Sequence, residues 1–292
     1  MSTTTDLISE VKLIGSFPTS NSLFSNDNFL TFLNREQLTT IVPLLNKVNE
    51  EYFITEKDYS ITANQANYRI PKRAVVSQLR DIQLISANGT VTKLTRLYED
   101  NRSSTNNGER GYYIKGNEIL LSPTPIQSVD TLRMIYMRRP SSFVLPTACA
   151  QIISIDTVLN QVVVSSLPSS MSTSTVVDFV QADSPYDLLT MDSSIVSVSG
   201  TTLSFASLPS DLAVNDYICI AGQTCVPMIP EELVTLLVQA VLCSCLSAKK
   251  DKSVELELQK LEQMKMTFTD VLSPRVKSND KVIVNRNGLL RF

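Results

Sequence analysis

The side chains with which this chain could perform catalysis are carboxylates, lysines and tyrosines, because its 292 residues include no histidine. Without histidine there is no Ser-His-Asp triad, no Cys-His pair and no HExxH zinc site. The glycine-rich phosphate-binding motifs GxxxxGKS/T and GxGxxG are also missing from the sequence. These gaps exclude hydrolases that depend on histidine and enzymes that hold nucleotides on such loops.

The densest group of carboxylates surrounds the segment SPYDLLTMD. Two of these aspartates could act as acid and base in glycan cleavage, and the loop could hold calcium without the regular ligand spacing of an EF-hand. Aspartates in Ser- and Pro-containing loops more often form turns through hydrogen bonds to their own backbone. We therefore predict no catalytic residue, no cofactor and no metal site, and no enzymatic activity. The four aspartates are Asp178, Asp183, Asp187 and Asp192.

The five cysteines are widely spread along the chain. Cys243 and Cys245 are two positions apart on a predicted helix, which separates them by about 200° around its axis. Two thiols on such different faces cannot chelate one metal ion. We interpret the cysteines as free, buried thiols of a reducing compartment.

Residues 274–292 form a polar, basic arm in which Asp280 is the only acidic residue. Such a tail can touch phosphates or dock on an acidic protein surface. Phe292 is its only aromatic residue, so base stacking is unsupported and we favour protein docking through β-augmentation. We expect the arm to be mobile in the free subunit and ordered in the assembled particle. The candidate docking residues are Arg275, Lys277, Lys281, Val282, Ile283, Val284, Arg286, Leu289, Leu290 and Arg291.

The elements before the arm are an apolar stretch, residues 233–248, and a charged amphipathic stretch, residues 253–272. The first stretch is apolar on every side, which is typical of a helix buried on most faces. It is shorter than the roughly twenty residues of a membrane span, and the amino terminus lacks the pattern of a signal peptide. We expect no membrane association. The candidate buried or interface residues are Leu233, Leu236, Leu237 and Val241.

Composition argues against a general attraction to nucleic acid, because the net charge is -3 and the pI about 5.2. Charged residues are 19% of the chain, below the roughly 25% usual in soluble domains. A surface of low charge is common in proteins that bury much of themselves against partners.

Helical spacing of apolar residues predicts a short helix at 4–14 and a longer one at 27–50, capped by Asp27 or Asn28 and broken near Pro43. From Tyr52 onward the apolar residues alternate, which predicts strands. Gly116-Asn117 is a suitable hairpin turn, and the charged loop 98–110 is expected to be exposed and mobile. The predicted strands are 52–54, 59–61, 68–70, 78–86, 112–115, 118–122 and 132–136.

Residues 152–222 contain an internal duplication, in which segment 153–179 aligns with segment 196–220. Ser-Leu-Pro-Ser at 166–169 matches the same tetrapeptide at 207–210, with a two-residue difference in the first turn. Each copy reads as strand, turn, strand, Pro-containing loop and strand, so two copies can bury each other's apolar face. The alternative is chance similarity in Ser-rich β sequence.

We predict an α+β fold with a helical bundle core, a β-rich segment, an inserted duplicated small β-barrel or sandwich, and an extended C-terminal arm. The predicted domains are 1–51 with 227–272 for the helical core, 52–146 for the β-rich segment, 147–226 for the insertion and 273–292 for the arm.

Several short motifs resemble the head-to-tail adaptor (connector) proteins of tailed bacteriophages, especially the short-tailed ones. The resemblance covers most of the chain and is carried by FLTFLNREQLTTIVPLL, YFITEKDYSI, the Tyr-x-Ile-Pro at 68–71, YIKGNEILLSPTP, IYMRRP, DYICIAGQTCVPMIPEELVTLL and LSPRV. It implies a ring, a dodecamer, below the portal protein, with helices around the channel and β parts facing tail components. The arm would reach the portal or a neighbouring subunit, and no metal or nucleotide is needed.

The predicted function is thus a structural virion protein of the neck, made in the host cytoplasm, that joins capsid to tail. DNA would pass through the ring without sequence-specific binding. Two alternatives are a tail-associated carbohydrate-binding or carbohydrate-cleaving protein that uses the aspartate cluster, and a nucleic-acid-binding module that uses the basic arm. The first is weakened by the absence of tryptophan, because glycan sites usually stack sugars on aromatic rings.

Overall fold

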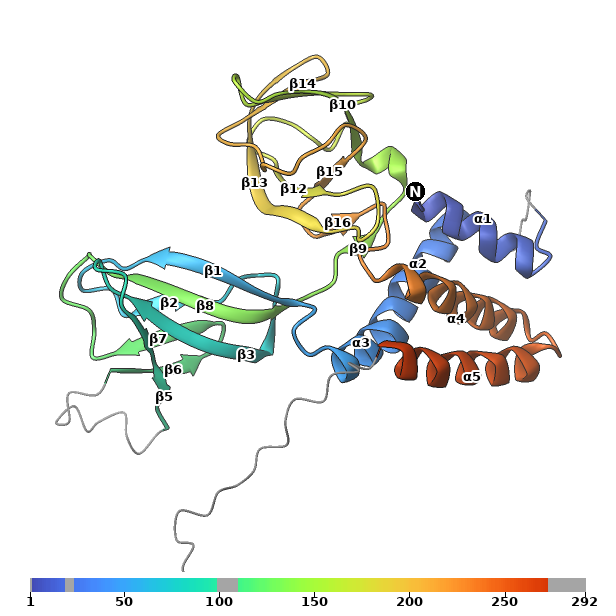
Figure 1. The fold of residues 1–292 in the computed structure, drawn as a ribbon, viewed down its shortest axis with the longest axis horizontal. Helices are drawn as coiled ribbons and strands as arrows, with labels where there is room; N and C mark the ends of the chain where they lie inside the picture. The colour runs from blue at the N-terminus through green and yellow to red at the C-terminus, as the bar shows by residue number, and fades with distance from the viewer. Residues whose placement is uncertain (1, 19–23, 99–109, 273–292) are drawn as a thin grey trace, which may run out of the picture.

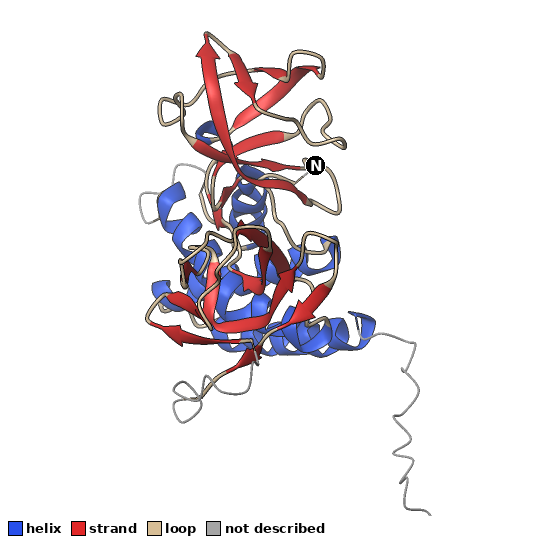
Figure 2. Ribbon diagram, turned by 90° about the vertical axis from the view of Figure 1, so that its left-hand side faces the viewer, coloured by secondary structure: helices blue, strands red, loops and turns tan. Residues whose placement is uncertain are grey.

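The computed structural model describes residues 2–18, 24–98 and 110–272, and its fold is the predicted mixture of helices and strands. Five α-helices lie together on the right of Figure 1, two four-stranded sheets lie on the left, and a closed six-stranded barrel lies at the top. Figure 2 shows the barrel above the paired sheets, with the helices behind the sheets. The chain therefore has one helical part and two β parts.

The first helices begin with capping boxes. In α1 (Thr4–Ile14), Thr3 is the N-cap and exchanges hydrogen bonds with Asp6; in α2 (Asn26–Glu36), Ser25 does the same with Asn28. Asn28 was predicted as a possible cap itself, but it is the third residue of the helix. That prediction was wrong because a Ser three residues before Asn satisfies two backbone N–H groups, whereas Asn28 alone would satisfy one.

The predicted break near Pro43 is a π-helical segment, Gln37–Ile41, that joins α2 to α3 (Val42–Val48). Proline has no N–H and its ring clashes with the carbonyl four residues earlier. Here Pro43 stands at the start of α3 and the wider π turn lies before it. The helical direction therefore continues while the backbone hydrogen-bond pattern changes.

The central helix is α4 (Glu231–Lys249), which packs against α1, α2 and α5 (Val254–Leu272). Its sequence is apolar around the whole circumference because neighbours cover it on several sides. Lys250 ends the helix in the left-handed conformation, at φ 56. The largest side chains buried around α4 include Leu7, Phe29, Leu33, Ile41 and Phe53.

The first β part consists of two antiparallel-rich sheets with strand orders β1-β8-β3-β4 and β2-β7-β6-β5. Its core is made by the alternate residues of these strands, among them Ile82, Ile119, Leu132 and Met134. The strands are β1 (Ile54–Ser60), β2 (Asn67–Arg69), β3 (Ala74–Ile85), β4 (Val91–Lys93), β5 (Thr95–Arg96), β6 (Gly111–Lys115), β7 (Glu118–Ser122) and β8 (Thr131–Arg138).

Two predicted strands, 52–54 and 59–61, are one strand in the structure. β1 pairs with β8 without interruption, from Ile54 opposite Met137 to Ser60 opposite Thr131. The residues between the two predicted strands are polar, and one of them, Asp58, accepts two hydrogen bonds from the Arg133 guanidinium on β8. The predicted hairpin at Gly116-Asn117 is confirmed by the β6–β7 register. The loop predicted at 98–110 lies almost wholly outside the described residues.

The inserted β part is a closed barrel with strand order β10-β11-β14-β13-β12-β15. Phe179 and Phe205 meet edge to face in its core, with ring centroids 4.9 Å apart. A short parallel pair, β9 (Ser142–Phe143) and β16 (Gln223–Thr224), lies where the chain enters and leaves it. The barrel strands are β10 (Ala150–Asp156), β11 (Gln161–Val164), β12 (Val176–Val180), β13 (Leu188–Ser199), β14 (Thr202–Phe205) and β15 (Tyr217–Ile220).

The two copies of the duplication make the same contacts in the barrel. Exchanging β10 with β13, β11 with β14 and β12 with β15 leaves the strand order unchanged. Backbone hydrogen bonds repeat in the same way, which chance similarity between Ser-rich strands would not produce. The matched bonds are Val164 N–H to Thr201 O with Phe205 N–H to Asn160 O, Ile152 N–H to Asp216 O with Ile195 N–H to Thr175 O, and Asn215 N–H to Ile152 O with Ser174 N–H to Ile195 O.

Candidate functional site

The sequence offered two candidate sites, and the structure describes one of them. The arm at 274–292 lies outside the described residues. The second candidate is α4, whose residues Leu233, Leu236, Leu237 and Val241 are all buried within the chain itself. These four side chains belong to the core of the subunit.

The helix α4 is long and apolar enough to cross a membrane by length and composition. It is three residues longer than the apolar run seen in the sequence, because Glu231, Glu232 and Lys249 extend it. However, 67% of its apolar 18-residue stretch is buried inside the chain. Such burial is typical of the core helix of a globular fold.

The outer face of α5 carries apolar side chains that sequence analysis did not single out. Leu256 and Met266 are 67% and 63% exposed and lie within about 80° of each other around the helix. Leu258, 45% exposed, lies on the other flank of the helix, about 160° from Leu256. The signal was present in the sequence, because these residues fall outside the helical stripe that faces α4. A helix with apolar groups on both faces is suited to contact a second surface.

The inner face of α5 is fixed on α4. Leu261 is buried between the two helices, and Val254, Met264 and Phe268 are partly buried beside it. The amide of Gln239 on α4 donates a hydrogen bond of 2.7 Å to a carboxylate oxygen of Glu257 on α5. This contact sets the rotation of α5 and therefore which residues its outer face presents.

A buried ion pair connects the two β parts. Arg73, in the turn before β3, reaches the barrel and lies 2.7 Å from the carboxylate of Asp178 on β12. The same guanidinium donates to the Ser141 hydroxyl at 3.0 Å. Asp178 is fully buried and also accepts backbone hydrogen bonds from Asp192 and Gly222. All its partners come from different segments, so this carboxylate orients the barrel against the paired sheets.

Replacing Arg73 with leucine is expected to lower the free energy of unfolding by about 3–5 kcal/mol, because the Asp178 charge would stay buried without its positively charged partner. Urea denaturation of the purified variant measures this change. The matched control is Arg80→Leu, which removes an exposed ion pair with Glu51 and is expected to cost less than about 1 kcal/mol. Equal losses in the two variants would contradict the role assigned to Arg73.

The aspartate cluster is only partly assembled in space. Asp178 and Asp192 both approach Arg73, at 2.7 and 4.0 Å, and Asp192 also lies 3.5 Å from Lys57. The backbone carbonyl of Asp183 accepts the N–H of Tyr186 in a turn, and the backbone carbonyl of Asp187 accepts the N–H of Gln181. The ion pairs of the cluster therefore involve the carboxylates of Asp178 and Asp192, whereas Asp183 and Asp187 take part in these bonds through their main chain.

Three of the five cysteines converge, which sequence analysis missed. The Sγ atoms of Cys149, Cys219 and Cys225 all lie within 4.8 Å of one another, and all three residues are buried. Hydrogen bonds from the Cys219 and Cys225 thiols lower the pKa of Cys149 to about 5. Burial, followed by the hydrogen bond with Cys149, raises the pKa of Cys219. Spacings of 70 and six residues carry no recognisable motif, so only the fold brings these thiols together.

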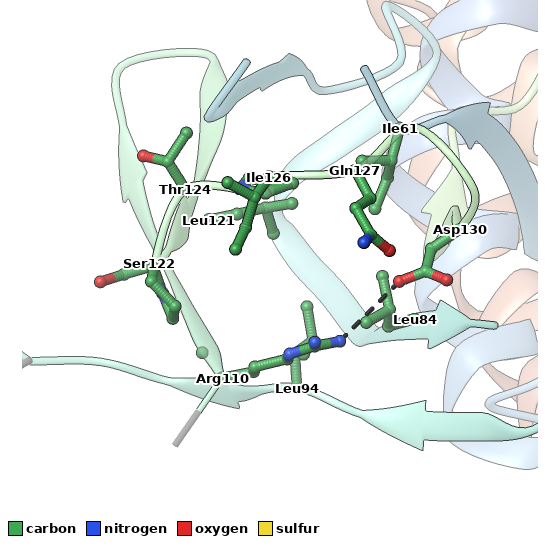
Figure 3. A pocket seen from close by; sticks show the side chains of 13 residues that line it. Ile61, Leu84, Leu94, Arg110, Leu121, Ser122, Thr124, Ile126, Gln127 and Asp130 are labelled. Atoms are coloured by element: carbon green, nitrogen blue, oxygen red, sulfur yellow. Dashed lines mark ion pairs between the residues drawn. The ribbon is translucent and has the colours of Figure 1, made fainter. Parts of the chain in front are cut away.

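The end of the paired sheets holds an apolar pocket of about 280 Å³ (Figure 3). Ile61, Leu84, Leu94 and Leu121 form its walls. Arg110 crosses one side and lies 3.8 Å from the carboxylate of Asp130. Its four apolar wall residues could hold an apolar group, and no nucleophile stands beside a base among the described residues that line it.

The chain matches the family model described as SU10 adaptor protein over residues 2–164. The match covers more than half of the 292 residues. It includes α1 to α3, all of the paired sheets and the first two barrel strands. A comparison with curated proteins found no match.

Proposed function

Because the chain belongs to the SU10 adaptor protein family, adaptors of the phage head-to-tail connector type, we propose that it forms a ring below the portal. It is a structural phage protein of adaptor type. In the proposed ring it joins the capsid to the tail at the neck of the virion and lets DNA pass. The family match is the observation that carries this function.

The subunit contact of the ring is proposed to involve the outer face of α5, meaning Leu256 and Met266. A ring needs heterologous contacts, in which one surface of a subunit meets a different surface of the next. The two apolar side chains lie on one helix that α4 already holds in place. Burying them would stabilise the contact by about 25 cal/mol for each Å² of apolar surface removed from water. The proposed copy number is twelve subunits, as the resemblance to connector proteins implies.

The parts of the subunit are assigned as the resemblance implies. The helical part, 1–51 with 227–272, would line the channel, and the β parts, 52–146 and 147–226, would face tail components. The arm would reach the portal or a neighbouring subunit. The net charge of -3 supports free passage of DNA, because clustered Lys and Arg along a channel would bind phosphates and slow its movement.

The proposed function is not enzymatic. Asp178, the most buried member of the aspartate cluster, is held by an arginine and two backbone N–H groups. Release of sugar from a host-surface glycan by the purified chain, lost on Asp183→Asn or Asp187→Asn, would contradict this view and favour a tail-associated glycan-cleaving protein.

Native mass measurement tests the ring directly. The purified chain, mixed with the portal protein of the same phage, is expected to give a complex that contains many copies per portal. Leu256→Asp with Met266→Asp is expected to stay monomeric while keeping the thermal midpoint of the unchanged chain. The control is Val158→Asp, which changes an even more exposed apolar residue, 87% accessible, on a barrel loop and should still assemble. A single copy on the portal, or none, would refute the ring.

A further inference from the structure

The cluster of Cys149, Cys219 and Cys225 is built by three separate segments. Cys149 precedes β10, Cys219 lies in β15 and Cys225 follows β16. β10 and β15 pair with Ala150 opposite Ile218, so the next residues, Cys149 and Cys219, meet across the two strands. Their Sγ atoms are 2.9 Å apart. The three thiols are at most 3% exposed.

The third thiol is held by a turn that joins the barrel to the helices. Thr224 exchanges hydrogen bonds with Val226, through its hydroxyl, on either side of Cys225. The Cys225 carbonyl accepts the N–H of Thr4 at the start of α1, and the Thr4 hydroxyl donates to the Val144 carbonyl. The backbone around the cluster is therefore fixed before any ligand arrives.

A lone buried cysteine usually acts as a small apolar side chain, and Cys243 and Cys245 on α4 fit that description. Three sulfur atoms in contact form a donor set. Around a common ion with metal–sulfur bonds of about 2.3 Å, tetrahedral or trigonal geometry separates the sulfurs by about 3.8–4.0 Å. Cys149 and Cys219 have their sulfurs 2.9 Å apart, and all three sulfurs lie within 4.8 Å of one another, so small side-chain rotations would reach this range.

The surroundings of the cluster indicate the class of ion. Its neighbours are Val180, Ala182, Tyr217, Val226 and Met228, and the chain has no histidine. Structural zinc sites almost always use four ligands, and iron–sulfur clusters use four cysteines. Soft thiolate and thioether donors also select Cu(I), which is satisfied by three sulfur ligands.

We propose that Cys149, Cys219 and Cys225 form a binding site for a soft monovalent d10 ion of the Cu(I) class, coordinated by three sulfurs. The site lies where β15 and β16 lead back to the helices. An ion there would link the barrel to the turn that is hydrogen-bonded to α1. An ion that binds the folded chain but not the unfolded chain would raise the thermal midpoint of unfolding.

The test uses the full chain, reduced and handled without oxygen. Cu(I), presented from a chromogenic chelator, is expected to bind at one ion per chain and to do so in preference to Zn(II) presented in the same way. The bound ion should raise the thermal midpoint and give a sulfur-to-copper absorption band in the ultraviolet. Native mass spectrometry of the same sample gives the stoichiometry.

Cys219→Ser is expected to lose stoichiometric binding, whereas the matched control Cys243→Ser should keep it. If Cys219→Ser does not fold, Cys225→Ala and the absorption band of the unchanged chain provide the same information. The site is refuted if Cu(I) does not bind, if Zn(II) binds more tightly, or if Cys243→Ser weakens binding as much as Cys219→Ser. None of these outcomes depends on ring formation.

Discussion

Replacing Leu237 with aspartate is expected to leave no folded subunit. The side chain lies in the centre of α4 with none of its surface exposed, among side chains of α1, α2 and α5. Truncating a buried leucine to alanine already costs about 2–5 kcal/mol, and an unpaired carboxylate in that place adds the cost of burying a charge. The sum approaches the whole stability of a typical domain, about 5–15 kcal/mol.

The measurement is the yield of soluble chain together with its far-ultraviolet circular dichroism and thermal midpoint. Leu256→Asp, the same change on the exposed face of α5, is the matched control and is expected to remain soluble with an unchanged midpoint. A soluble Leu237→Asp chain that still docks on heads would mean that α4 is not the core of the subunit.

Deleting residues 274–292 is expected to abolish the joining of heads to tails while the subunit still folds. The described residues of the helical core lie between Leu7 and Phe268, and the deletion leaves all of these in place. The arm lies outside the described residues, and its proposed role rests on its sequence. The Val282-Ile283-Val284 run can add a strand to a partner's sheet, and the surrounding Arg and Lys residues can pair with acidic groups.

Ordering the arm costs roughly 1–2 kcal/mol per residue in backbone entropy, which a continuous ladder of main-chain hydrogen bonds on a partner can offset. Ile283→Pro removes an N–H from that ladder and should abolish joining as the deletion does. Ser278→Pro, outside the apolar run, is the control and should preserve it. Hydrogen exchange gives the direct readout: protection of the amides at 281–285 in dilute free subunit would contradict docking that occurs only in the particle.

Local patterns in the sequence determined most of the elements. The uncharged stretch at 233–248 predicts a buried helix, because a helix with apolar residues all around its circumference must be covered by neighbours on most sides. Gly116-Asn117 predicts the hairpin because a two-residue turn needs a residue tolerant of positive φ, and Gly116 has φ +61. The duplication predicts the barrel because each copy exposes an apolar face that only its counterpart covers. The resemblance to connector proteins drew on the same short motifs, and the family match agrees with it.

Other features depended on contacts between distant residues. β1 became one strand because β8, about 75 positions later, supplies a partner for every residue along it. The structural role of Asp178 could not be predicted, because its ion-pair partner Arg73 belongs to the other β part. The two apolar faces of α5 became distinguishable only when α4 covered one of them.

The thiol cluster is the clearest example of a feature that only the tertiary structure decided. Cys149 and Cys219 are 70 positions apart, and the sequence around each reads as an ordinary apolar strand. A periodic pattern reports which face of an element is buried, since burial repeats with the turn of a helix or the pleat of a strand. The periodic pattern does not indicate which strand pairs with which in the sheet. That choice is made when the barrel closes and places β10 beside β15, and only then do three thiols become one site.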